Sequence, residues 1–163
     1  MKPAINSISV LLIMPLFLLM AGTGCKPRLN DFSRYENIDT DGWQYGDTLF
    51  FDIEVQDSVV QGNLNLNIRH TNDYPYQNLW IEIIKSDSMS IVVDTLNIPM
   101  SDMYGHWYGR GIGTDFQLTR SLGDSIELTT GTRLKVRHIM RTDRLTGLEQ
   151  IGIEFTELRD HKR

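Results

Sequence analysis

The sequence predicts an all-β protein, a single small β-sandwich of about seven or eight antiparallel strands. The clearest segment is 63–71, where Leu64, Leu66 and Ile68 alternate with asparagine residues. This period of two is the pattern of a strand with one face toward water. Similar short segments follow with turn residues between them, and no long helical pattern occurs beyond the first 24 residues. A small barrel is the alternative architecture.

The other expected strands are identified from β-branched and aromatic content and from alternation. They cover residues 48–56, 79–85, 91–98, 115–120, 133–141 and 150–155. Residues 121–131 allow two interpretations, because 122–124 are typical of a turn whereas Ile126 and Leu128 fit a brief strand.

The N-terminus has the pattern of an export signal that ends in a lipid attachment site. Lys2 precedes an unbroken apolar run at 10–21, which is shorter than the about 20 residues that a membrane-spanning helix needs. Small residues at 22–24 then precede Cys25, the only cysteine of the chain. We therefore expect cleavage after residue 24 and acylation of the Cys25 sulfur, which anchors the domain in a bilayer. The alternative is an ordinary signal followed by an unrelated cysteine.

This assignment divides the chain into four parts. Residues 1–24 are the lipoprotein signal peptide, 25–41 the lipidated Cys25 and a polar tether, 42–158 the β-sandwich domain, and 159–163 a polar tail. Removing 24 of the 163 residues leaves 139, which is enough for about one domain. The full chain has a formal net charge of −5 and no basic stripe, so nucleic acid and anionic lipid headgroups are poor candidates for partners.

The longest segment without strand character is 99–114, which is rich in glycine and aromatic side chains. A nucleotide site is not expected there, because glycines that hold a phosphate lead into a helix N-terminus and this segment leads into a strand. Such a loop suits stacking on a sugar ring or docking of a protein, and the alternative is that Trp107 only plugs one end of the sandwich. The candidate partner-binding residues are Tyr74, Tyr76, Trp107, Tyr108 and Arg110.

The sequence predicts no catalytic residue, no metal site and no small-molecule cofactor. It has no Gly-x-Ser-x-Gly elbow and no cysteine left to act as a nucleophile. His70 and His138 occupy the apolar phase of their strands, which is typical of half-buried, hydrogen-bonded histidines rather than of zinc ligands. A hydrolase is a third hypothesis, and two carboxylates roughly 5–9 Å apart in a cleft would support it.

Three stretches, together with Cys25, resemble a known family. They are 72–79 (NDYPYQNL), 105–111 (GHWYGRG) and 138–147 (HIMRTDRLTG). In this order and spacing the chain resembles the gliding-motility lipoprotein GldH family of Bacteroidota over nearly all of its mature length. The resemblance implies a non-enzymatic envelope lipoprotein that supports the gliding machinery and the protein secretion tied to it. It implies no catalytic residues.

The expected partners are therefore the lipid bilayer, through acylated Cys25, and other envelope proteins of the motility or secretion apparatus. Surface lipoproteins of that phylum often carry an acidic run after the lipidated cysteine, but here residues 26–30 are KPRLN. We therefore expect the outer membrane, with the domain facing the periplasm. The alternative function is a glycan-binding β-sandwich lipoprotein that uses Trp107 and Tyr108, which coplanar exposed rings would favour.

Overall fold

The computed structural model describes residues 30–158, so that the signal peptide, Cys25 and the tail 159–163 lie outside the described residues. Between 30 and 158 the chain forms strands and no helix. Accordingly, this part of the chain contains no helix of the length and apolar character that crossing a membrane requires. The strands are β1 (Phe32–Asn37), β2 (Trp43–Gln44), β3 (Leu49–Asp52), β4 (Val59–Thr71), β5 (Asn78–Ser86), β6 (Ile91–Pro99), β7 (Arg110–Ile112), β8 (Asp115–Thr129), β9 (Arg133–His138), β10 (Arg144–Leu145) and β11 (Leu148–Glu157).

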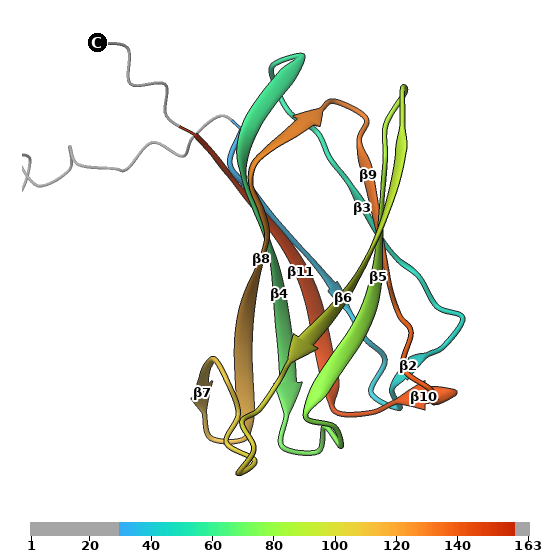
Figure 1. Cartoon of the computed structure of the whole chain (residues 1–163), viewed down its shortest axis with the longest axis vertical. Helices are drawn as coiled ribbons and strands as arrows, with labels where there is room; N and C mark the ends of the chain where they lie inside the picture. Colours follow the sequence, from blue (N-terminus) through green and yellow to red (C-terminus); the bar gives the residue numbers. More distant parts are fainter. Residues whose placement is uncertain (1–29, 159–163) are drawn as a thin grey trace, which may run out of the picture.

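Two antiparallel sheets face each other across one hydrophobic core (Figure 1). The five-stranded sheet has the order β1-β11-β4-β8-β7, and the four-stranded sheet has the order β3-β9-β5-β6. A small β10-β2 ladder lies at one end. The predicted all-β sandwich is confirmed, and the additional strands β2, β7 and β10 are only two or three residues long, too short to show a period in the sequence.

The core forms where the alternating residues of both sheets point inward. On β4, Leu66 and Ile68 are fully buried, and they pair with the equally buried Ile153 and Ile151 of β11. Cross-strand partners lie on the same face of a sheet, so one apolar layer extends across both strands. Burying one such side chain contributes about 1.5–3 kcal/mol, and this layer therefore fixes the register of the central strands.

The predicted tether 25–41 is too long, because Phe32–Asn37 pairs with β11 as the edge strand β1. The strand is hard to recognise because Arg34 and Glu36 interrupt any apolar alternation. Its Tyr35 ring lies over Gly152, where an added Cβ would stand 2.3 Å from a ring carbon. The domain therefore begins about ten residues before the expected boundary at residue 42.

The ambiguous segment 121–131 belongs largely to β8, which continues from the expected 115–120 to Thr129. Its register against β4 shifts near Leu64, and Gly123 and Ser125 have positive φ angles of 156° and 59° there. The bulged geometry explains why the segment resembles a turn in the sequence although the chain remains in the sheet.

The strand directions define two ends of the sandwich. Asn30 and Leu158 lie at one end, the upper end, together with the turns 53–58, 87–90 and 130–132 (Figure 1). The side chain of Asn30 accepts a hydrogen bond from the Gln56 amide (2.9 Å), which fastens the start of the domain there. The longer connections lie at the opposite, lower end.

Candidate functional site

Three connections between strands meet at the lower end of the sandwich. They are 72–77, 100–109 and 139–147, and we call them the lower loops (Figure 1). Backbone hydrogen bonds join them, because the Thr71 amide donates to the Gly147 carbonyl (2.8 Å) and the Met100 amide donates to the Gln77 carbonyl (2.8 Å). All five candidate partner-binding residues lie in the lower loops or directly beside them.

Tyr74 is a core residue with only 2% of its surface exposed. Its hydroxyl donates a hydrogen bond to the Asn78 carbonyl (2.8 Å), and its ring lies 6.0 Å from the His70 ring. Burial raises the pKa of the Tyr74 hydroxyl well above its usual value, so the group stays a neutral donor. Tyr74 therefore lies in the core and supports the lower loops from within, whereas the sequence placed it among the candidate partner-binding residues.

Trp107 is half-buried and closes the lower end of the core. Its ring meets His70 edge-on, with centroids 4.8 Å apart and planes at 66°, and it also contacts the Phe116 ring at 6.3 Å. The indole nitrogen donates to the Asn72 side chain (2.9 Å), which satisfies the one polar atom of the ring. This arrangement is the plug that the sequence offered as the alternative to docking.

Tyr108 remains exposed at 44%, and its amide donates to the Met100 carbonyl (2.8 Å). Among residues 30–158 no ring contact joins Tyr108 to Trp107. Because Trp107 faces inward, the two rings do not form the coplanar platform on which a sugar would stack. Coplanar exposed rings of Trp107 and Tyr108 would have favoured the glycan-binding alternative, and the structure does not have them.

Tyr76 borders a shallow groove on the outer face of the four-stranded sheet. The groove has a volume of about 490 Å³, and its other lining residues are Trp80, Ile139, Met140 and Arg141. Tyr76 is 38% exposed and Trp80 40% exposed, and the Trp80 amide donates to the Met140 sulfur (3.3 Å). The two sequence motifs around Pro75 and Met140 thus lie side by side here and leave aromatic surface open to a partner.

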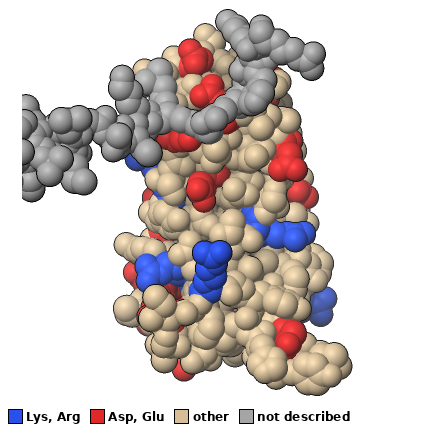
Figure 2. Space-filling model, turned by 90° about the vertical axis from the view of Figure 1, so that its left-hand side faces the viewer, with Lys and Arg blue, Asp and Glu red and all other residues tan. Residues whose placement is uncertain are grey.

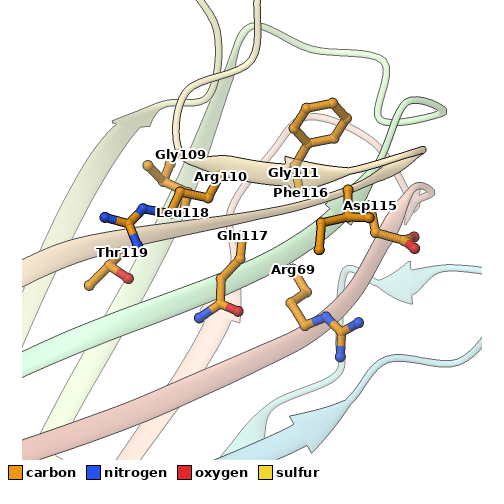
Figure 3. A pocket seen from close by; sticks show the side chains of 10 residues that line it. Arg69, Gly109, Arg110, Gly111, Asp115, Phe116, Gln117, Leu118 and Thr119 are labelled. Carbon is orange, nitrogen blue, oxygen red and sulfur yellow. The ribbon is translucent and has the colours of Figure 1, made fainter.

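Arg110 lies on β7 and faces outward on the five-stranded sheet (Figure 3). It pairs across the strands with Gln117, which in turn pairs with Arg69. A groove of about 850 Å³ runs along this row. Arg69 lies 3.9 Å from Glu149, whereas Arg110 has no hydrogen bond or ion pair within the described part of the chain. Figure 2 shows Lys and Arg side chains gathered across the lower half of this face, so a negatively charged group of a partner would be favoured there.

Three further exposed side chains of this region were not predicted from the sequence. Met103 is 79% exposed, Tyr104 77% and Ile112 90%. The Asp102 carboxylate accepts hydrogen bonds from the amides of Tyr104 (2.8 Å) and His106 (2.9 Å) and contacts the His106 ring at 2.9 Å. The hydrogen bonds from His106 lower the pKa of Asp102. Asp102 precedes Tyr104 by two residues and His106 by four, and this spacing is the sequence signal for the ordered turn.

The two buried histidines are more buried than expected. His70 and His138 are both fully buried, and the backbone of Trp43 and Gln44 provides hydrogen-bond partners for the His138 ring. The prediction of half-buried rings is therefore wrong for both histidines, and the His138 ring packs edge-on against Trp43 and Tyr45. Burial lowers the pKa of both histidines, which keeps them neutral at physiological pH.

Neither groove has the residues that hydrolysis of a glycoside needs. The groove beside Arg110 contains one carboxylate, Asp115, and the groove beside Trp80 contains none. In the part of the chain that the structure describes, no three His, Cys, Asp or Glu side chains come together as metal ligands. What the lower end offers is exposed aromatic and apolar surface beside an arginine without a partner.

Comparisons with known proteins give one consistent family. A family model described as GldH lipoprotein matches residues 30–155. A Christiangramia forsetii protein named gliding motility lipoprotein GldH homolog is 34% identical over 100 residues, which are 60% of this chain and 59% of that protein. The gliding motility lipoprotein GldH of Flavobacterium johnsoniae is 33% identical over 81 residues, which are 49% of this chain and 50% of that protein.

These alignments thus span only about half to three fifths of the length of the two relatives. Among solved structures, the Eiger TNF of S. frugiperda gives a TM-score of 0.37 at 10% identity, covering 82% of this chain and 98% of that one. The family model, by contrast, spans nearly the whole described domain, and on that basis the chain belongs to the GldH lipoprotein family.

Proposed function

We propose that this protein is a non-enzymatic docking protein of the cell envelope, which supports the gliding machinery or the associated protein secretion by binding other envelope proteins. Membership of a lipoprotein family is the reason for membrane anchoring. The observation that carries the docking role is the arrangement of the domain. The lower loops present exposed aromatic and apolar side chains. They lie at the end of the domain opposite Asn30, and Asn30 is the described residue nearest in sequence to Cys25.

The anchor is the acylated Cys25. Four residues lie between Cys25 and Asn30, and the five Cα–Cα steps from Cys25 to Asn30 span at most about 18 Å when fully extended. Two or more acyl chains anchor a protein stably, so the upper end is held close to the bilayer. We propose the outer membrane with the domain facing the periplasm, because residues 26–30 lack an acidic run.

The docking residues are the exposed ones. Tyr76, Tyr108 and Arg110 keep the role predicted from the sequence, and Met103 and Tyr104 join them. Tyr and Arg are enriched among residues that dominate binding energy, since they combine large contact area with a polar group. Tyr74 and Trp107 act indirectly, by holding the lower loops in place.

The anchor is tested with Cys25→Ser in the natural host. We expect the protein to lose its acyl mass and to move from the membrane fraction to the soluble fraction. An unchanged mass with unchanged membrane association would reject lipidation at this residue.

Docking is tested with the variant Met103→Ser/Tyr104→Ser/Tyr108→Ser, which keeps Trp107 and the core. We expect urea unfolding to change by less than about 0.5 kcal/mol, because these side chains are exposed. In a host that glides, colony spreading and type IX secretion should both fall to the level of the deletion strain. The matched control is Met89→Ser, which removes a 95% exposed methionine at the upper end and should leave both activities intact.

A triple variant with full spreading and secretion would contradict the docking role of the lower loops. A control variant that loses both activities would move that role to the upper end. Purified variants that lose their fold would be replaced by Tyr104→Ser alone, whose side chain is 77% exposed.

A further inference from the structure

Four strands form the edges of the two large sheets, and three of them are protected against pairing with another chain. Natural edges are protected by short length, charge, bulges or covering segments. The edge β1 is six residues long and carries Arg34 and Glu36, and β3 is four residues long. The edge β7 is only three residues long, and the part of β8 beyond it bulges near Gly123 and carries Arg120.

The fourth edge, β6, lacks most of these protections. It has nine residues, pairs with β5 from Ser86↔Ile91 to Asn78↔Pro99 without a register shift, and has no lysine or arginine. Its only proline is Pro99, the last residue. Ile91 is 72% exposed, Val92 51% and Val93 57%. β6 is therefore a long, regular and apolar strand whose outer side is unpaired within residues 30–158.

An apolar row leads across the outer face of the four-stranded sheet to this edge. Phe50 of β3, Lys135 of β9, Ile84 of β5 and Val93 of β6 are consecutive cross-strand partners. Phe50 is 51% exposed, and the Lys135 ammonium lies 5.9 Å above its ring. A further strand beside β6 would place one of its side chains next to Val93 and extend this row.

Asp94 is the single charged residue of β6. It pairs with the buried Ile83, so it lies in the inward phase of the strand. Its carboxylate accepts a hydrogen bond from the Thr95 amide (2.8 Å), and no ion pair to it forms among residues 30–158. An added strand would bring one residue directly opposite Asp94, and a lysine or arginine there would supply the missing countercharge.

The same carboxylate disfavours a second copy of this chain. Antiparallel pairing of β6 with itself about Asp94 would oppose two carboxylates, and pairing about Thr95 would oppose Asp94 with Leu96. A carboxylate on an open edge thus selects against self-pairing and permits a cationic partner strand.

We propose that β6 is the binding site for an extended segment of another envelope protein, with aliphatic residues at alternate positions and a lysine or arginine opposite Asp94. Main-chain hydrogen bonds give the affinity and the side-chain row gives the specificity, as in other cases of strand addition. The proposal rests on the proposed docking function, but it uses a surface separate from the lower loops.

The test uses the mature lipidated protein in lipid nanodiscs and a dye-labelled heptapeptide, Thr-Val-Thr-Lys-Val-Thr-Val. Paired antiparallel with 91–97, its lysine faces Asp94. We expect fluorescence anisotropy to report binding, and amide exchange to slow along β6. A peptide with the same side chains but N-methylated at alternate amides should not bind, because it cannot donate to the edge, and it also controls for partitioning into lipid.

A charge swap gives the sharper result. Asp94→Lys should weaken binding about tenfold, since an attractive cross-strand pair becomes a repulsive one, and a peptide with glutamate in place of lysine should restore it. Glu36→Lys on the edge β1 is the matched control and should bind both peptides as the unmodified protein does. The Met103→Ser/Tyr104→Ser/Tyr108→Ser variant should also bind normally, which separates this proposal from docking by the lower loops.

Absence of binding at about 1 mM peptide, equal binding of the N-methylated peptide, or slowed exchange on β1 in place of β6 would each overturn the proposal. Dimerisation of the protein that depends on β6 would overturn it in favour of a second copy. Full spreading and secretion in the Met103→Ser/Tyr104→Ser/Tyr108→Ser variant would contradict only the role of the lower loops, whereas loss of peptide binding to β6 would contradict only this proposal.

Discussion

Gly147 lies against the backbone of Tyr74, so closely that a Cβ added to Gly147 would stand 2.3 Å from the Tyr74 nitrogen. Gly147 also has a positive φ of 78°. The two motifs that carry the resemblance to the GldH family, around Pro75 and around Met140, therefore meet at this glycine. Its hydrogen atom is the only side chain for which the contact leaves room.

Gly147→Ala should destabilise the domain more than an ordinary glycine substitution. An alanine with positive φ costs about 1–2 kcal/mol, and the backbone of Tyr74 cannot rotate away from the new methyl group. Gly131→Ala is the matched control, because Gly131 has φ 87° with no atom within 4 Å of an added Cβ. In urea unfolding we expect Gly147→Ala to lose at least about 1 kcal/mol more than the control. Equal losses would show that the contact with Tyr74 is unimportant.

Tyr74→Phe removes the hydrogen bond to the Asn78 carbonyl and leaves that acceptor without its buried partner. We expect a loss of about 0.5–1.5 kcal/mol in the free energy of unfolding. Tyr76→Phe is the control two residues away, because Tyr76 is 38% exposed. It should change the unfolding midpoint by no more than the error of the fit, and a larger effect there than at Tyr74 would be inconsistent with the structure.

The buried histidines predict a loss of stability in mild acid. Burial lowers the pKa of His70 and His138 below the usual 6.5, so between the folded pKa and 6.5 the unfolded chain binds more protons than the folded chain. Their neutral forms stabilise the fold fully above pH 6.5, and this stability declines as the pH falls below 6.5. Thermal unfolding from pH 7.5 to 5 should show the decline.

His138→Phe should make that decline shallower, because one of the two groups no longer titrates. If the pH dependence of the variant matches that of the unmodified protein, His138 is not a source of the acid sensitivity.

Asp102→Ala should loosen only the loop that presents Met103 and Tyr104. The amides of Tyr104 and His106 lose their acceptor, so their hydrogen exchange should speed up at least about tenfold while global unfolding is unchanged. Asp87→Ala is the counterpart at the upper end, where the carboxylate accepts from the amides of Met89 and Ser90. Each variant should affect its own turn, and exchange that changes in both turns at once would argue against independent local ordering.

The fold class could be predicted from the sequence because the residues of β4 alternate clearly between apolar and polar. Leu64, Leu66 and Ile68 alternate with asparagines, and their burial follows that period. β1 could not be predicted, because its place is set by pairing with β11 and not by its own apolar pattern. Local sequence carries no record of such long-range pairing.

The aromatic residues proposed for docking could be placed in the lower loops from the sequence, but their exposure could not be predicted residue by residue. Aromatic content marked the loops, yet it does not tell Tyr74, which is buried, from Tyr76, which is exposed, because both flank Pro75. The exposure of Met103 and Tyr104 could not be predicted, because nothing in their own chemistry shows that Asp102 orders the turn around them. The apolar edge β6 was expected as a strand, but its place at the edge depends on the strand order.

The length of β4 sets the distance between the upper and lower ends of the domain. Its 13 residues at about 3.3 Å each make a rigid rod of about 43 Å between the upper and lower ends. Because β1 belongs to the domain, only four residues lie between Cys25 and Asn30, so under the proposed anchoring at Cys25 the lower loops would stand tens of ångströms from the leaflet. Under that proposal, a partner of the lower loops would itself have to project tens of ångströms from the membrane.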